Sequence, residues 1–303
     1  MAVIVTGNIG LDLEPGVQKA FGLALKQFPT FYDKVFEVKD VKERFAKDFL
    51  WRGLGILSVK DEAGAVDYDT MSQGWAKTYE QVAYATGFQI SKEAVDDGHA
   101  IDVAKQGAME LSRAAHETLE IMTANHLNRA FNSSYLGGDG VELCATTHPT
   151  LGAGNQANKL AVAADLSEAS VEQMIIDMSA VLSERGFKRA IKPKMLICHP
   201  SEAFNAHRIL NSALQNDTMN NAINAIRSMG LIPAGVLATP FLTDSDAFFI
   251  KTDVDRGLQL LIKNRPEVMR SNDDDTLNAK FIVYMRFDSG WTDPMTVFGT
   301  PGA

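Results

Sequence analysis

Cysteine and histidine are the first side chains in this sequence that could bind a metal ion or act as nucleophiles. Cys144 and His148 are four residues apart. Cys198 is followed directly by His199, so two pairs with zinc-ligand chemistry are present. Cys198 ends an apolar segment, however, and a cysteine in that position is typically a small buried side chain. We therefore expect no metal site at these residues.

The other titratable residues that stand out are an acidic triplet, two histidines ten residues apart and two lysines. Adjacent carboxylates more often form a solvated turn than a cation site, because a hard cation needs about six converging oxygens. The histidines fall in one predicted helix and are better explained as structural residues, and nothing near the lysines predicts a lowered pKa. These residues are Asp273, Asp274 and Asp275; His116 and His126; and Lys60 and Lys77.

The absence of known motifs argues against catalysis, and the charge pattern argues against a nucleic-acid-binding groove. The chain has no Walker loop and no GxGxxG, GxSxG or HExxH pattern. Its formal charge is −9, and no block of five basic residues predicts a nucleic-acid-binding groove. An acidic surface can still enclose nucleic acid, because it repels phosphate and does not stick to it. We expect no catalytic residue, no cofactor, no metal ion and no enzyme activity.

Length and composition predict two packed units, or one domain with a large insertion. The chain has 303 residues, which exceeds the size at which a single hydrophobic core usually stops growing. Its composition, with 46% apolar and 22% charged residues, is that of an ordinary globular protein. No apolar run is long enough to cross a membrane, and the N-terminus lacks the basic region of a secretory signal. Two cysteines far apart in sequence fit a reducing compartment.

The most regular element is a proline-free segment, residues 92–131, which predicts one helix roughly 60 Å long. Ser91 is its expected N-cap, and the GGDG sequence at residues 137–140 is the expected stop. Because the apolar face is narrow and rich in alanine, we expect it to lie close against a sheet. That face is Ile101, Ala104, Ala108, Leu111, Ala115, Leu119 and Met122.

Two projecting segments precede this helix. Residues 1–47 predict an extended arm with an amphipathic helix that Pro29 ends, followed by an apolar cluster from Phe31 to Val38. The cluster packs either on the chain's own core or on a neighbouring subunit. Residues 48–80 predict a β-tongue, with strands at 54–59 and from Val66 and a turn at 61–64. An isolated hairpin is marginal in water, so the tongue should lean on another surface.

The rest of the chain predicts an α/β insertion between β-rich segments. Alternation over residues 81–90 predicts a strand that leads into the long helix, and residues 132–165 are rich in loops. Asp165 and Glu168 resemble a capping box for a helix that Gly186 closes. The other expected elements are helices at 201–213 and 218–229; strands at 195–198, 231–238 and 247–250; and C-terminal strands at 257–262 and 281–287, with the acidic triplet in the turn between them.

The order of these parts resembles the major capsid protein of tailed bacteriophages, the α+β Hong Kong phage fold that herpesvirus shells and encapsulins share. The closing region is the most similar stretch, with residues 241–250 (FLTDSDAFFI), Arg265-Pro266-Glu267 and residues 290–294 (GWTDP). Other motifs resemble the Mu-like head-subunit branch. They are Asp139-Gly140, Thr147-His148-Pro149, residues 164–168 (ADLSE), Lys192-Pro193-Lys194 and His199-Pro200.

The resemblance implies an assignment for each part. Residues 1–47 are the N-arm and 48–80 the E-loop; 81–159 and 246–303 form a peripheral domain around the spine helix at 92–131; and 160–245 form an axial domain. It implies self-assembly in the host cytoplasm, through pentamers and hexamers, into an icosahedral virion shell around double-stranded DNA contacted non-specifically. The expected partners are a separate scaffolding protein, a portal and possible decoration proteins, with no membrane. The scaffold is expected to be separate because the resemblance predicts no N-terminal scaffolding segment in this chain.

Two alternatives remain open from the sequence. An encapsulin-like compartment would share the fold and enclose a cargo enzyme in place of DNA. A soluble α/β enzyme with a long helix would require an activity that depends on Cys198 or His199. The long arm and the Mu-like motifs favour the phage capsid.

Overall fold

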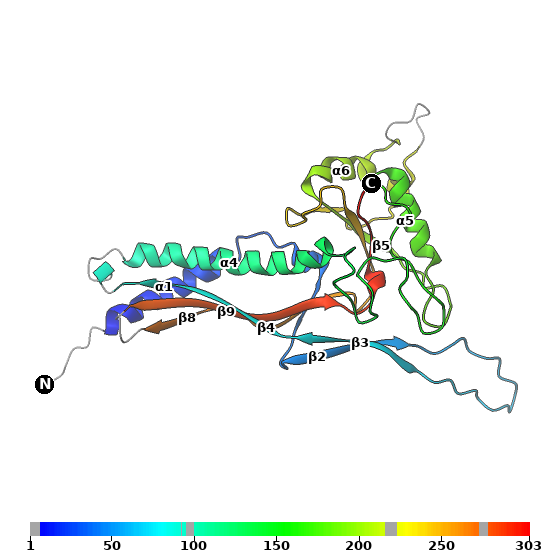
Figure 1. Ribbon diagram of the computed structural model, residues 1–303, viewed down its shortest axis with the longest axis horizontal. Coiled ribbons are helices and arrows are strands. Elements are labelled where there is room, and N and C mark those ends of the chain that lie inside the picture. Colours follow the sequence, from blue (N-terminus) through cyan, green and yellow to red (C-terminus); the bar gives the residue numbers. More distant parts are fainter. Residues whose placement is uncertain (1–6, 92, 95–99, 216–222, 273–277) are drawn as a thin grey trace.

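The computed structural model describes residues 7–91, 93–94, 100–215, 223–272 and 278–303. A long helix lies over a long twisted sheet, a compact α/β unit sits at one end, and a two-stranded hairpin projects beside it (Figure 1). The buried apolar residues form two clusters, one beneath the long helix and one inside the α/β unit. The described part of the chain thus contains two cores, a pattern that fits either two packed units or one domain with a large insertion.

The long helix, α4 (Ala100–Asn128), confirms the strongest prediction, although it is shorter than expected. Residues 95–99 lie outside the described part, and Ser91 Oγ accepts a hydrogen bond from the Ala94 amide at 3.3 Å, as a cap does. The helix ends at Asn128, before the GGDG sequence, where the Asn128 side chain bonds the backbone of Phe241 and Thr243. Its 29 residues span about 43 Å.

The alanine face of α4 packs on strands and on a second helix. Ala104, Ala108 and Ala115 are fully buried, and α4 contacts β4 (Val82–Ile90) and β9 (Ala279–Trp291). Met122 is an exception to the predicted stripe, since 37% of it is exposed, and the Ile101 side chain lies outside the described residues.

The helix α1 (Gly7–Leu25) also lies along α4 (Figure 1). Val17 and Phe21 are buried there, as are Val35, at the end of α2 (Tyr32–Val35), and Phe36. Of the two alternatives for these apolar residues, packing on the chain's own core is the one observed. The predicted amphipathic helix is confirmed within α1 for residues 17–25, whereas residues 7–16, which were expected to be extended, are helical as well.

The main sheet has the order β1-β8-β9-β4, with β1 (Glu37–Asp40) parallel to β8 (Leu258–Asn272) and the other neighbours antiparallel. The strand predicted over residues 81–90 is confirmed, because β4 pairs with β9 along its whole length. Both C-terminal strands are longer than predicted. The turn expected at Asp273, Asp274 and Asp275 lies outside the described residues.

The tongue is a hairpin, but its strands differ from those predicted. They are β2 (Phe45–Arg52) and β3 (Ser72–Glu80), joined by a loop at residues 53–71 that contains no strand. The prediction of strands at 54–59 and from Val66 is wrong, because those residues have no neighbouring chain to bond. Only the turn near Asp61 is present, where the Gly64 amide donates to the Asp61 carbonyl at 3.0 Å. We call residues 53–71 the tongue loop.

The α/β unit contains a four-stranded sheet in the order β10-β7-β5-β6, made of Val297–Thr300, Phe248–Thr252, Pro193–Cys198 and Val236–Ala238. Its helices are α5 (Glu168–Ala180), α6 (Ala203–Asn211), α7 (Ala225–Ser228) and two single turns, η1 (Pro200–Glu202) and η2 (Pro294–Thr296). The family resemblance implies that residues 246–303 belong to the other unit, but β7 and β10 complete this sheet.

Three helix boundaries in this unit differ from the prediction. Ser167, with Ser170 as its reciprocal partner, caps α5, in place of Asp165 and Glu168. The helix stops at Ala180, before Gly186. Of the helix predicted at 218–229, residues 216–222 lie outside the described part, Ile223 forms a β-bridge with Leu214, and only α7 is helical.

Candidate interaction surfaces

The cysteines and histidines that could bind metal are occupied by structural roles. Both thiols are buried, and burial raises the pKa of Cys144 far above its usual value and that of Cys198 to about 11. His199 caps η1, where its Nδ1 accepts a hydrogen bond from the Ser201 amide at 3.2 Å. Within the described part of the chain, no three His, Cys, Asp or Glu side chains converge on a possible metal position.

His148 belongs to a buried polar network where the two units meet. Its Nδ1 lies 2.6 Å from Asp139 Oδ2, and its Nε2 lies 3.0 Å from Asn158 Oδ1. The Asn158 oxygen also accepts the Ala145 amide at 2.8 Å. Its Nδ2 is within 3.0 Å of three carbonyls, those of Leu143, Pro294 and Val297. One amide side chain therefore ties the loop after α4 to the C-terminal segment.

His116 lies under the elbow between α1 and α2, beside a carboxylate that the sequence analysis missed. Its Nε2 lies 3.1 Å from the Pro29 carbonyl, and burial lowers the His116 pKa. Glu120, 1% exposed, accepts the amides of Phe31 at 2.7 Å and Tyr32 at 3.2 Å. Burial raises the Glu120 pKa to about 6, although the two amides oppose that shift. His116 and Glu120 therefore attach the elbow to α4 through hydrogen bonds to its backbone.

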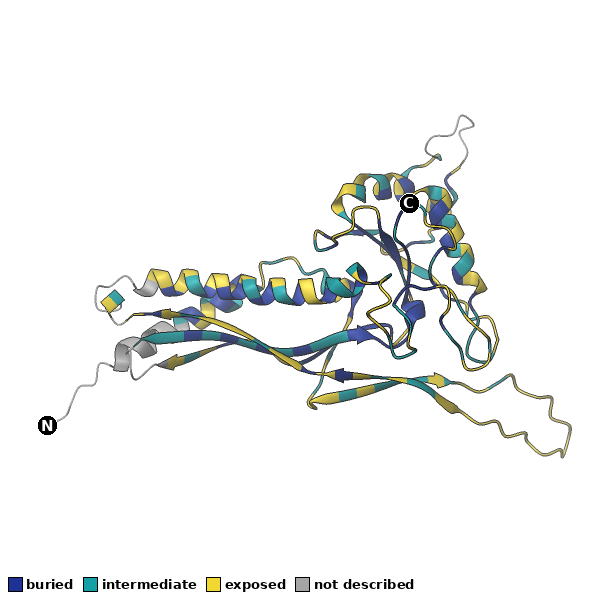
Figure 2. Ribbon diagram, in the orientation of Figure 1, coloured by how far each residue is buried: buried dark blue, intermediate teal, exposed yellow. Residues whose placement is uncertain are grey.

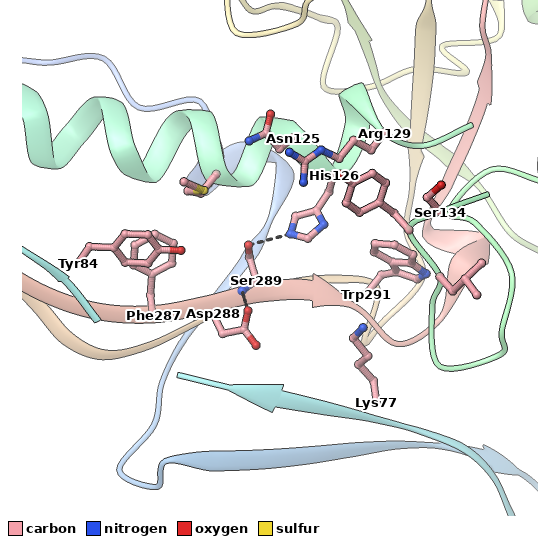
Figure 3. A pocket seen from close by; sticks show the side chains of 13 residues that line it. Lys77, Tyr84, Asn125, His126, Arg129, Ser134, Phe287, Asp288, Ser289 and Trp291 are labelled. Carbon is pink, nitrogen blue, oxygen red and sulfur yellow. Dashed lines mark hydrogen bonds between the residues drawn. The ribbon is translucent and has the colours of Figure 1, made fainter. Parts of the chain in front are cut away.

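His126 and Lys77 come together at a pocket of about 370 Å³ between α4, β9 and β3, which we call the α4–β9 pocket (Figure 3). His126 Nε2 lies 2.8 Å from Ser289 Oγ, and burial lowers its pKa to about 4, so the ring is neutral at neutral pH. Lys77 Nζ lies 5.7 Å from the centroid of the Trp291 ring. Nothing in this arrangement activates a nucleophile.

The tongue is the least protected part of the described chain, as Figure 2 shows. Leu57, Val59 and Tyr68 are 93%, 96% and 94% exposed, and Lys60 is exposed beside them. The other large apolar side chains exposed on the tongue are Phe45, Trp51, Leu54, Ile56, Val66 and Met71. Exposed apolar side chains gathered on one projecting element are typical of a protein–protein contact.

One arginine holds both ends of the tongue loop. Arg185, from the α/β unit, donates to the carbonyls of Gly53 at 2.9 Å and Thr70 at 2.8 Å, and to Asp69 Oδ1 at 2.9 Å. Asp69 Oδ2 accepts the amide of Gly55 at 2.8 Å, and these hydrogen bonds lower the pKa of Asp69. We call this group the Arg185 fork. Sequence patterns do not identify it, because Arg185 is more than 100 residues from the other members.

A second set of exposed apolar side chains lies on the α/β unit. Its members are Val162, Ile176, Phe187, Phe204, Leu214, Ile223 and Met229, and Phe204 is 81% exposed. Among the described residues, no helix is both long enough and apolar enough to cross a bilayer. Because apolar side chains are exposed on both the tongue and the α/β unit, these two regions are candidates for contacts with other protein chains.

Comparison with solved structures shows the fold. The chain matches a virus-like particle from Pyrococcus furiosus (TM-score 0.54, 11% identity, 94% of this chain and 97% of that chain). It also matches the procapsid of bacteriophage JBD30 (TM-score 0.54, 13% identity, 98% and 76%) and the capsid of a native GTA particle (TM-score 0.55, 13% identity, 90% and 89%). These similarities identify the Hong Kong phage capsid fold.

Sequence comparison identifies the family. No curated protein matches the sequence at a significant level. The family model for phage capsid proteins matches residues 76–299, which include β4, α4, the α/β unit and both long C-terminal strands. Because that match covers well over half of the sequence, the chain belongs to the phage capsid protein family.

Proposed function

We propose that this chain is the repeating subunit of an icosahedral phage head, assembled through pentamers and hexamers in the host cytoplasm around double-stranded DNA. The observation that carries the proposal is the tongue loop, whose apolar side chains are exposed although the Arg185 fork holds both of its ends. A projecting apolar element on one subunit is suited to cover another subunit. The formal charge of −9 suits an inner wall that contacts DNA non-specifically and does not grip it.

The parts of the chain have distinct roles in this proposal. Residues 1–47 act as the N-arm and 48–80 as the E-loop; 81–159 and 246–303, apart from β7 and β10, form the peripheral domain; and 160–245 with those strands form the axial domain. The motifs near Thr147 and Lys192 support a place in the Mu-like branch. A separate scaffolding protein, a portal and decoration proteins are the proposed partners.

Electron microscopy and light scattering of the expressed chain, alone and with the genes beside it, test this function. We expect closed shells of megadalton mass that contain DNA when the packaging genes are present. A variant with residues 56–68 replaced by a short Gly-Ser linker keeps the Arg185 fork and should remain folded but form no shells. Monomers or dimers under every condition would refute the proposal, and shells that hold a cargo enzyme would favour the encapsulin alternative.

A further inference from the structure

A pocket of about 310 Å³ lies between the α/β unit and the segment that contains α2 and β1. We call it the Lys251 pocket, after the lysine of β7 that lines it. Two further lysines, Lys34 and Lys194, line it as well. A cavity of this volume can receive a small organic molecule. The pocket therefore combines space with primary amines, which react with carbonyl compounds.

Lys251 is held at the wall of this pocket by its strand and by one hydrogen bond. Its neighbours on β7, Ile250 and Thr252, are buried, whereas Lys251 itself is half-buried. Because side chains alternate along a strand, Lys251 lies on the opposite face of the sheet from these two residues. Its Nζ donates a hydrogen bond to the Lys34 carbonyl at 2.9 Å, so the amine has a fixed position.

The amine of Lys251 is depleted of its proton, because the lining carboxylates bond elsewhere. Burial, and then the positive charge of Lys194, lower the Lys251 pKa to about 8, although Glu37 opposes the shift. At pH 7 about one in ten Lys251 amines is then neutral, whereas an ordinary lysine, with a pKa of about 10.4, is neutral in fewer than about one in a thousand. Of the lining carboxylates, Asp33 accepts the Thr30 hydroxyl at 2.8 Å, Glu37 pairs with Lys39 at 2.9 Å and Asp253 accepts the Lys192 amide at 2.9 Å; the fourth is Asp255.

We propose that Lys251 is a modification site at which a small anionic aldehyde or keto acid forms an imine. A desolvated lysine beside a second cation is an arrangement that activates the amine for this chemistry. The nitrogen bonds to the carbonyl carbon, and the carbonyl oxygen leaves as water with the two amine protons, so the step needs no oxidant or reductant. The ammonium groups of Lys34 and Lys194 remain to pair with the anionic group of the ligand. The inference does not depend on the proposed function, because every group in it belongs to one chain.

Reductive trapping tests the site, since cyanoborohydride converts an imine into a stable secondary amine. The full-length chain is treated at pH 7 with limiting 4-formylbenzoate, and the labelled lysines are measured by peptide mass spectrometry. Lys251 should carry the adduct about fivefold or more above Lys60, an exposed lysine of the tongue loop. Equal or lower labelling of Lys251 would overturn the proposal.

Two matched comparisons test the causes of this reactivity. The methyl ester of 4-formylbenzoate has the same aldehyde without the charge, so its preference for Lys251 should be smaller, and an equal preference would refute an anionic ligand. Lys194→Met should lower the labelling of Lys251 about threefold or more, because it removes a neighbouring positive charge. Lys192→Met, an exposed lysine outside the pocket, should leave the labelling unchanged. If Lys194→Met also leaves it unchanged, the pocket does not activate the amine and the proposal fails.

Discussion

The approach of α4 to the sheet can be tested at one glycine. Gly107 lies on the buried side of α4, and a Cβ built there falls 2.5, 2.7 and 2.8 Å from three carbons of the Phe88 ring on β4. Real Cβ atoms do not approach carbon so closely, so Gly107→Ala requires the ring or the helix to move. Phe88 is stacked on Phe281, with centroids 5.3 Å apart, and Phe281 is 1% exposed, which limits how far the ring can retreat.

Two opposing effects set the size of the change in the free energy of unfolding. Replacing glycine by alanine inside a helix normally stabilises it by about 1 kcal/mol. Overpacking a tight contact normally costs about 1–3 kcal/mol. Since the new Cβ would clash with three ring carbons and Phe281 packs behind the ring, we expect the overpacking cost to exceed the gain in helix propensity. Gly107→Ala should destabilise the chain by about 1–2 kcal/mol.

Urea unfolding of the unassembled full-length chain measures this change, and α1 supplies a matched control. Gly22 is also helical, but a Cβ there has no atom within 4 Å, so Gly22→Ala should stabilise the chain by up to about 1 kcal/mol. In a Phe88→Ala background, Gly107→Ala should become neutral or stabilising. If Gly107→Ala instead raises stability as much as Gly22→Ala does, α4 does not lie on β4 as described.

Three further predictions concern α4 and the buried polar groups. Because the pKa of Glu120 is raised in the folded chain, the free energy of unfolding is greatest when Glu120 is protonated and falls as the pH rises from about 4.5 to 6. Across that window, the unfolding free energy of Glu120→Gln should rise by about 1–2 kcal/mol relative to that of the wild type, as measured by urea titration at each pH. Asn158→Ala leaves several buried groups unpaired and should cost about 3 kcal/mol or more by thermal unfolding. Ala108→Pro should cost about 3 kcal/mol or more and abolish shells in electron micrographs, whereas normal shells would contradict the role of α4 as the spine.

The elements that the sequence predicted well are those with a long, regular pattern of their own. Ala104, Ala108, Leu111, Ala115 and Leu119 recur at helical spacing, and all five are buried on α4. The alternation in β4 is equally regular, and Tyr84, Phe88 and Ile90 on one face are the more buried residues of the strand, although Val82 is 47% exposed. Such periodicity is a local property of the sequence, so it can be recognised without knowing which elements pack against the helix or strand.

The tongue strands were misplaced because a strand also needs a partner. Residues 54–59 have the apolar composition of a strand, yet the hairpin pairs at β2 and β3, where distant groups hold it. Gln259 donates to Asp48 at 2.7 Å, and the hydroxyls of Tyr79 and Thr292 lie 3.0 Å apart. These contacts join residues more than 200 positions apart, and no window along the sequence contains both partners.

The polar anchors, which sequence reasoning missed entirely, differ in strength, and that difference decides which part of the subunit moves. The side chain of Asn158 is fully buried and forms hydrogen bonds to both units. Separating the units would therefore leave several buried backbone groups without a hydrogen-bond partner at once. The Arg185 fork is partly exposed to solvent, and water can replace the hydrogen bonds through which it holds the tongue. In the proposed shell, where one subunit fits both five-fold and six-fold neighbours, we expect the Arg185 fork to break before the Asn158 junction does. We therefore expect the tongue to take up the angular difference, while α4 and the main sheet keep one shape.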